Sequence, residues 1–117
     1  MEVLEVANDK KLIKEFLLLP VRLYKKENNW IRPLDKDIEA VFDKKTNKTF
    51  RNGECIRWII KNDQGETSGR IAAFINKKTV NKDNDQPTGG LGFFECVNDQ
   101  RFAFKLFDIA KEWLESR

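Results

Sequence analysis

Apolar side chains recur at two spacings along this chain, and the change from one spacing to the other marks the predicted elements. Alternating apolar positions predict strands, whereas apolar positions three or four apart predict helices. The resulting order is a strand over 2–6, a helix over 10–25, a short helix after Asp35, strands over 55–60, 67–77 and 90–97, and a helix to Arg117. Asn8 or Asp9 is expected to cap the first helix and Asp35 the second, while Pro20 is expected to end or kink the first.

This order predicts a single α+β domain over residues 1–117, with helices packed on a largely antiparallel sheet in the order β-α-α-β-β-β-α. The last helix has the clearest apolar face, which we expect to be buried. Its members are Phe102, Leu106, Ile109, Ala110 and Trp113. Lys105, Asp108, Lys111 and Glu112 are expected to point mostly outward.

The composition of the chain excludes some kinds of functional site. The chain has 117 residues, a net charge of +3 and no histidine, so a Cys/His zinc site and histidine acid–base catalysis are excluded. No apolar run approaches the roughly 20 residues of a membrane span, and we expect a cytoplasmic protein. Cys55 and Cys96 fall in predicted strands, where two buried free thiols are favoured over a disulfide.

Four segments carry a family resemblance: Leu19–Tyr24, Asn29–Leu34, Gly69–Phe74 and Gly92–Cys96. Together with the order of elements, they resemble the first two-thirds of a GNAT-type N-acetyltransferase, within a group of longer bacterial proteins. The resemblance implies that the chain is the N-terminal portion of such a fold or a degenerate binding domain. The isolated chain is then expected to be inactive or to bind CoA weakly.

In that family a Q/R-x-x-G-x-G/A segment after the fourth strand lets backbone N–H groups bind the pyrophosphate of acetyl-CoA at a helix N-terminus. Here Gln100 can take the first conserved position and Ala103 that of the first glycine, whereas Lys105 replaces the second small residue and the segment has no glycine. Asp99 adds a carboxylate that suits a plain N-cap. The resemblance implies acetyl-CoA as cofactor, and its candidate contacts are Val97, Gln100, Arg101, Phe102, Ala103 and Lys105.

Glu95 is the candidate catalytic base. It stands among apolar neighbours on a predicted central strand, where a carboxylate is costly unless it is paired, and the family often places a base on this strand. The alternatives are a solvent-facing residue or a partner for Arg57 or Arg70.

The loop between the first two helices supplies the candidate acceptor contacts, Trp30 and Arg32. They match the region that lines the acceptor site in the family, although Trp30 can equally pack against the sheet. Arg57 and Arg70 either bind an acidic ligand or lie on the solvent-exposed face of a hairpin. Tyr24 is either an acid or the edge of the core.

The resulting hypothesis is transfer of an acetyl group from acetyl-CoA to a small-molecule or peptide amine by direct attack, with no metal and no membrane. A non-catalytic partner-binding or structural domain is the main alternative, and self-association through the incomplete sheet edge is a further expectation. A nucleic-acid-binding module is the minor alternative. Gly90–Cys96 resembles a strand of the RNA-recognition motif, but Leu91 and Cys96 stand where that motif needs stacking aromatics.

Overall fold

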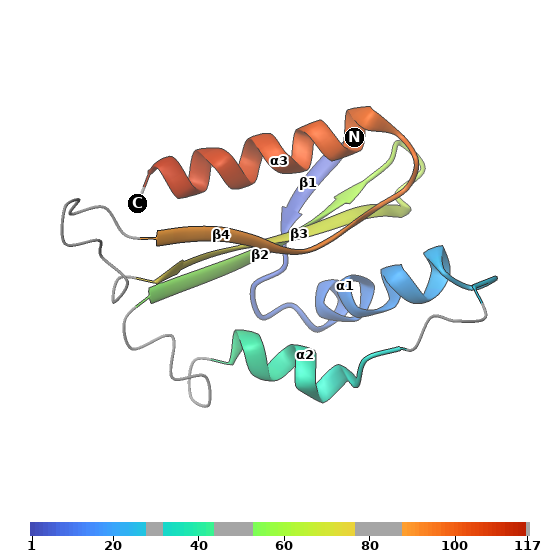
Figure 1. Cartoon of the computed structure of the whole chain (residues 1–117). Helices are drawn as coiled ribbons and strands as arrows, with labels where there is room; N and C mark the ends of the chain where they lie inside the picture. The colour runs from blue at the N-terminus through green and yellow to red at the C-terminus, as the bar shows by residue number, and fades with distance from the viewer. Residues whose placement is uncertain (28–31, 44–52, 77–87, 117) are drawn as a thin grey trace.

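A four-stranded antiparallel sheet forms the centre of the protein, with α3 on one face and α1 and α2 on the other (Figure 1). The computed structural model describes residues 1–27, 32–43, 53–76 and 88–116. The elements are β1 (Glu2–Glu5), α1 (Lys10–Leu23), α2 (Asp35–Phe42), β2 (Gly53–Lys61), β3 (Thr67–Asn76), β4 (Thr88–Cys96) and α3 (Gln100–Glu115). The α+β class and the predicted element order are confirmed. Since the strands lie in the order β1-β2-β3-β4, β4 forms one edge of this sheet.

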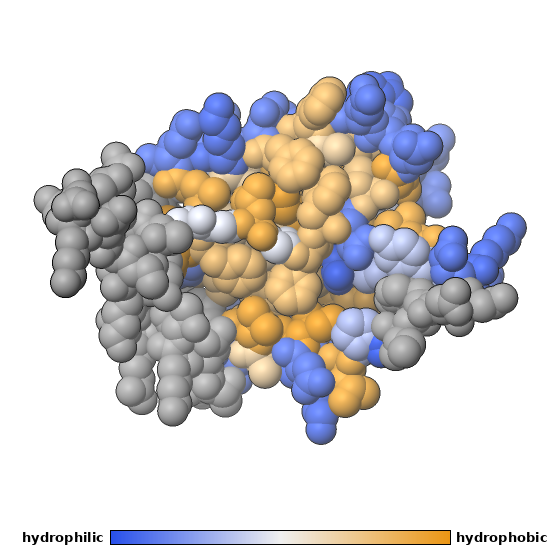
Figure 2. All heavy atoms as spheres, viewed as in Figure 1, coloured by the Kyte–Doolittle hydropathy of each residue, from blue (hydrophilic) through white to orange (hydrophobic). Residues whose placement is uncertain are grey.

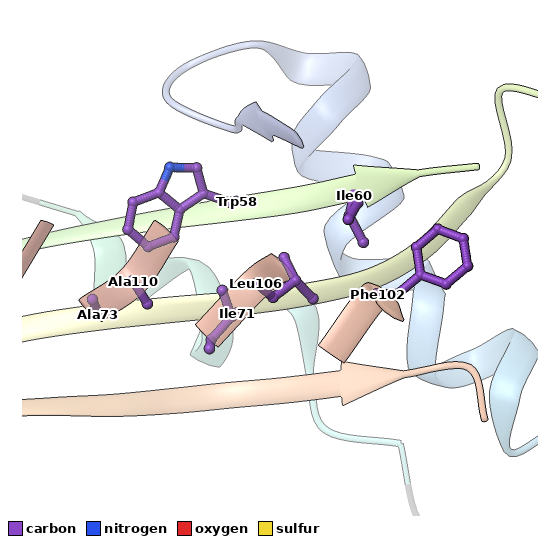
Figure 3. Packing of buried hydrophobic residues seen from close by; sticks show 7 residues of the cluster. All are labelled: Trp58, Ile60, Ile71, Ala73, Phe102, Leu106 and Ala110. Carbon is purple, nitrogen blue, oxygen red and sulfur yellow. The ribbon is translucent and has the colours of Figure 1, made fainter. Parts of the chain in front are cut away.

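The face covered by α3 is an apolar core. One side of α3 packs on inward-pointing side chains of β2 and β3 (Figure 3), and the buried members are Trp58, Ile60, Ile71, Ala73, Phe102, Leu106 and Ala110. Ile109 and Trp113 pack at its margin, half-buried. The helical face predicted from spacing is therefore the one that the fold buries.

The opposite face contains two buried arginines. Arg57 and Arg70 are each 5% exposed, so the expectation that they lie on a solvent-exposed face is wrong. The reason is that α1 and α2 cover this side and offer aromatic rings to the guanidinium groups. Arg57 lies 4.2 Å from the centre of the Phe42 ring, and Arg70 lies 4.6 Å from that of Phe16.

Arg57 also binds a carboxylate. Its Nη1 and Nη2 donate to the two oxygens of Glu39 in α2, at 2.6 and 3.0 Å. The pair compensates for burying the charge and fastens α2 to β2.

Pro20 does not end α1, which continues to Leu23. Because proline has no N–H, the carbonyl of Phe16 loses the intrahelical donor that residue 20 would supply. Arg70 Nη1 donates to that carbonyl at 2.7 Å. A side chain from β3 thus replaces the missing helical hydrogen bond.

The helix starts are only partly as expected. Asp9 caps α1 by accepting from the amides of Lys11 and Leu12. Asp35 is not a cap, since α2 begins at Asp35 itself and its carboxylate binds Arg32 Nη2 at 2.9 and 3.0 Å.

The two thiols are free and half-buried rather than fully buried. Cys55 lies in β2 and Cys96 in β4, with β3 between these strands, so they are not neighbours in the sheet.

Candidate functional site

The pairing of β3 with β4 is interrupted by a bulge. Arg70 is opposite Glu95 and Ala72 is opposite Gly92, so β4 carries one more residue than β3 in this interval. Phe93 within the bulge has a φ of 54°, which is rare for a residue with a side chain. Arg70 Nε donates to the Phe93 carbonyl at 3.1 Å. Bulges redirect neighbouring side chains and are frequent beside active sites, which draws attention to Glu95.

Glu95 is half-buried and accepts a hydrogen bond from the hydroxyl of Tyr24 at its Oε2. Tyr24 is the C-terminal cap residue of α1, and its own amide donates to the Pro20 carbonyl. The expectation that Tyr24 marks the edge of the core is incomplete, because its ring is half-buried but its hydroxyl has an ionisable partner. The sequence signal that could have revealed this is a phenol at the end of an otherwise apolar helical stripe.

Arg70 connects the two elements that carry this pair. One of its nitrogens binds the Phe16 carbonyl in α1 and another binds the Phe93 carbonyl in β4. Both acceptors are irregular positions, one freed by a proline and one in a bulge. The arginine therefore holds the end of α1 close to the bulged part of β4.

Electrostatics follow from this packing. The hydrogen bond to Glu95 raises the pKa of Tyr24 above its usual 10.0, with burial and the charge of Glu95 acting in the same direction. Burial lowers the pKa of Arg70 to about 10, against the opposing effect of the Glu95 charge. Within the described ranges no ion pair joins Glu95 to an arginine. Its observed partner is Tyr24 rather than Arg57 or Arg70.

A cavity of about 50 Å³ adjoins Glu95. It brings Glu95 and Arg32, predicted separately as base and acceptor contact, to one site, while Trp30 lies outside the described residues. The other lining residues are Leu17, Pro20, Pro33, Asp35, Ile38 and Arg70. Such a volume holds a few water molecules or one small polar group such as an amine.

The first turn of α3 already has an anionic cap. The Asp99 carboxylate accepts from the amide of Arg101 at 3.0 Å and from its guanidinium at 2.8 Å. These hydrogen bonds lower the pKa of Asp99. A carboxylate therefore stands where the resemblance expects a phosphate.

The remaining cofactor candidates have different surroundings. The amide of Val97 donates to the Ser68 carbonyl, and the amide of Ala103 donates to the Asp99 carbonyl at 3.4 Å. Phe102 is buried in the core, whereas the side chains of Gln100 and Lys105 are exposed.

A larger cavity, of about 490 Å³, lies on the face covered by α1 and α2. Its polar lining includes Glu5, Glu39 and Arg57. Of the residues predicted to bind a ligand, Arg57 alone is among those that line it. Its walls come from residues far apart in the chain, between Glu5 and Arg57, so no local pattern in the sequence predicts the cavity itself.

The described ranges contain neither a cluster of metal ligands nor a membrane-spanning helix. No three His, Cys, Asp or Glu side chains among residues 1–27, 32–43, 53–76 and 88–116 converge as metal ligands do. Likewise, no helix in that part of the chain combines the length and apolar character needed to cross a membrane.

Comparison with known proteins gives one informative similarity. The chain is 31% identical over 105 residues to the bacterial ceramide synthase of Caulobacter vibrioides (strain NA1000 / CB15N). The aligned part is 90% of this chain but 27% of the synthase, so the chain spans about a quarter of the length of this curated relative. No protein-family profile matches the chain. No solved structure matches it.

Proposed function

We propose that this chain forms the acceptor-binding part of a GNAT-type N-acyltransferase fold, in which Glu95 accepts a proton from an amine. The observation that carries the proposal is the shared cavity, since Glu95 and Arg32 reach it from β4 and from the segment before α2. The helices on both faces of an antiparallel sheet and the bulge beside Glu95 are consistent with the same assignment.

The chemistry asked of Glu95 is simple. An ammonium ion becomes nucleophilic when its nitrogen gives up a proton, and the Glu95 carboxylate takes that proton. The freed nitrogen lone pair then attacks the carbonyl carbon of the acyl donor. Oε2 is held by Tyr24, which leaves Oε1 as the acceptor facing the substrate. As the C–N bond forms, the C–S bond of the thioester breaks, the CoA thiolate leaves, and the nitrogen loses its remaining extra proton to give the amide.

The first turn of α3 does not fit the donor's pyrophosphate. It has no glycine, and the Asp99 carboxylate caps it with a charge that repels phosphate. We therefore assign no donor contact to this turn and expect weak binding of acetyl-CoA to this chain.

The similarity to a ceramide synthase supports the reaction class. A ceramide is an amide of a fatty acid with a long-chain amino alcohol, so that name describes formation of an amide. Four apolar side chains border the cavity, Leu17, Pro20, Pro33 and Ile38, which suits an amine carried on an apolar body. We propose a lipophilic primary amine as the acceptor.

Binding and turnover test this assignment. Calorimetry should detect a long-chain amino alcohol binding to the chain, and amide formation with acyl-CoA should be followed by mass spectrometry, for this chain and for any longer form. Glu95→Gln should lower turnover by about 100-fold or more. Glu112→Gln, an exposed carboxylate on α3, is the control and should leave turnover unchanged. If neither amine nor acyl-CoA binds to either form, the transferase assignment is wrong.

The second candidate is a partner-binding domain without catalysis. It is favoured by an apolar surface, here called the edge patch, that consists of Leu91 and Phe94 in β4 with Phe104 and Phe107 in α3. Figure 2 shows hydrophobic side chains gathered in the centre of this view, over β4 and the adjoining side of α3. Exposed apolar clusters of this kind mark interaction sites.

A further inference from the structure

The Tyr24–Glu95 pair has a geometry that goes beyond a chance surface contact. Tyr24 ends α1 and Glu95 follows the bulge of β4, so the two residues are 71 positions apart in the chain. Both side chains are half-buried, and Arg70 binds carbonyls on both of their elements. The contact is therefore set by the tertiary fold rather than by local sequence.

The two oxygens of the Glu95 carboxylate are in different situations. Oε2 accepts the Tyr24 hydroxyl, whereas Oε1 has no hydrogen-bond partner among the described residues and is not buried out of reach of solvent. Glu95 also lines the small cavity. A carboxylate held at one oxygen and accessible at the other is suited to take a proton in a fixed direction.

We propose that Tyr24 is the positioning residue of this site, which orients the Glu95 carboxylate so that Oε1 faces the acceptor amine. This inference rests on the proposed function. Tyr24 acts through Glu95 and is not assigned a contact with the reacting atoms. Its hydroxyl donates to Oε2 and fixes the orientation of the carboxylate.

Other charges surround the pair. Arg70 from β3 faces both groups, and Glu27 after α1 raises the pKa of Tyr24 as the smallest of its causes. Arg32 and Asp35 line the cavity and neutralise one another. The phenol therefore responds mainly to Glu95.

The first experiment measures the Tyr24–Glu95 contact by titration and does not require enzymatic turnover. Tyr24 is the single tyrosine of the chain, so phenolate absorbance reports it alone. Its titration midpoint should lie above 10.0, and Glu95→Gln should lower it. Glu27→Gln is the matched control and should lower it less. A midpoint that Glu95→Gln does not move would overturn the proposal.

The second experiment reads the role in catalysis, with the acyl-CoA and amine pair that supports turnover. Tyr24→Phe should lower kcat about 10- to 100-fold while the KM for the amine and the melting profile stay unchanged. A rise in the KM for the amine together with a lowered melting temperature would indicate a structural role and refute positioning. If neither this chain nor a longer form has turnover while the Tyr24 titration behaves as expected, the proposed function is wrong and the Tyr24–Glu95 contact stands.

Discussion

At the scale of single residues, Asp99 shows how a carboxylate can serve structure where a family resemblance expects a ligand. It binds both the amide and the guanidinium of Arg101, and these hydrogen bonds lower its pKa from the usual 3.8. A lowered pKa means that the folded state favours the ionised carboxyl more than the unfolded chain does. The cap therefore stabilises the fold only while Asp99 is charged.

The pH dependence of this cap is testable. Its full contribution should be present above pH 3.8 and be lost as the pH falls through the lower pKa of the folded state. Asp99→Asn keeps a capping oxygen without the charge, so the stability difference from the unaltered chain should vanish in acid. Thermal unfolding followed by circular dichroism from about pH 6 to about pH 2 measures it. A difference that persists in acid would contradict this account.

The residues of the candidate site were predictable to different degrees. Glu95 was visible in the sequence because a carboxylate interrupts an apolar strand, and Arg32 because its loop follows the first helix. Their convergence on one cavity depends on how α2 packs on the sheet, which periodicity does not encode. The bond from Tyr24 to Glu95 spans 71 positions and has no local signature.

At the scale of elements, Pro20 and Arg70 form a pair that the sequence does not reveal. An internal proline usually ends or kinks a helix. Here α1 continues past Pro20, because Arg70 binds the Phe16 carbonyl that the proline leaves unpaired. The strands and the buried face of α3 followed from spacing alone, since their packing agrees with their local pattern. The first helix differs because a long-range hydrogen bond overrides a local preference.

A double-mutant cycle tests this compensation. Arg70→Met should destabilise the protein by about 2 kcal/mol, because it leaves buried carbonyls without donors. Pro20→Ala restores an amide at position 20, so the cost of Arg70→Met in that background should fall by about 1 kcal/mol. Urea unfolding of the four proteins gives the coupling. Strict additivity would show that Arg70 does not substitute for the missing amide.

The contact of β3 with α3 depends on a glycine. A Cβ at Gly69 would lie 2.8 Å from Leu106 Cδ1 and 3.0 Å from Ile60 Cγ2, so Gly69→Ala should destabilise the fold by about 1–3 kcal/mol. Gly90→Ala is the matched control within the sheet, because nothing lies within 4 Å of its added carbon. Chemical denaturation should separate the two variants. Equal destabilisation by the two substitutions would mean that the Leu106 side chain moves aside to accommodate the added methyl group.

At the scale of the whole molecule, β4 is an edge strand of the described sheet and carries an apolar surface. Glu95 is the single charged residue among the nine of β4, whereas natural edge strands are usually protected by charges or proline. The edge patch lies beside it on β4 and α3. We propose that a second copy of this chain covers the patch, by pairing of two β4 strands across a twofold axis.

Charge placement supports this arrangement. In an antiparallel pair centred near Gly92, the two Glu95 side chains lie at opposite ends of the ladder, about 20 Å apart, and do not repel strongly. The same apolar side chains then meet from both copies, as an isologous interface requires. The bulge at Phe93 shortens the regular ladder, so we expect a weak dimer rather than an obligate one.

Sedimentation across a range of concentrations tests the interface. The mass of the unaltered chain should rise with concentration, and Phe94→Asp should hold it at the monomer value, because the change places two carboxylates in an apolar contact. Leu34→Asp is the matched control, because it also places a carboxylate on an exposed apolar side chain. Leu34 is 60% exposed and lies before α2, outside the edge patch. The apparent mass of the Leu34→Asp variant should rise with concentration as that of the unaltered chain does. A monomer at every concentration, or equal effects of the two variants, would exclude a second copy as the occupant.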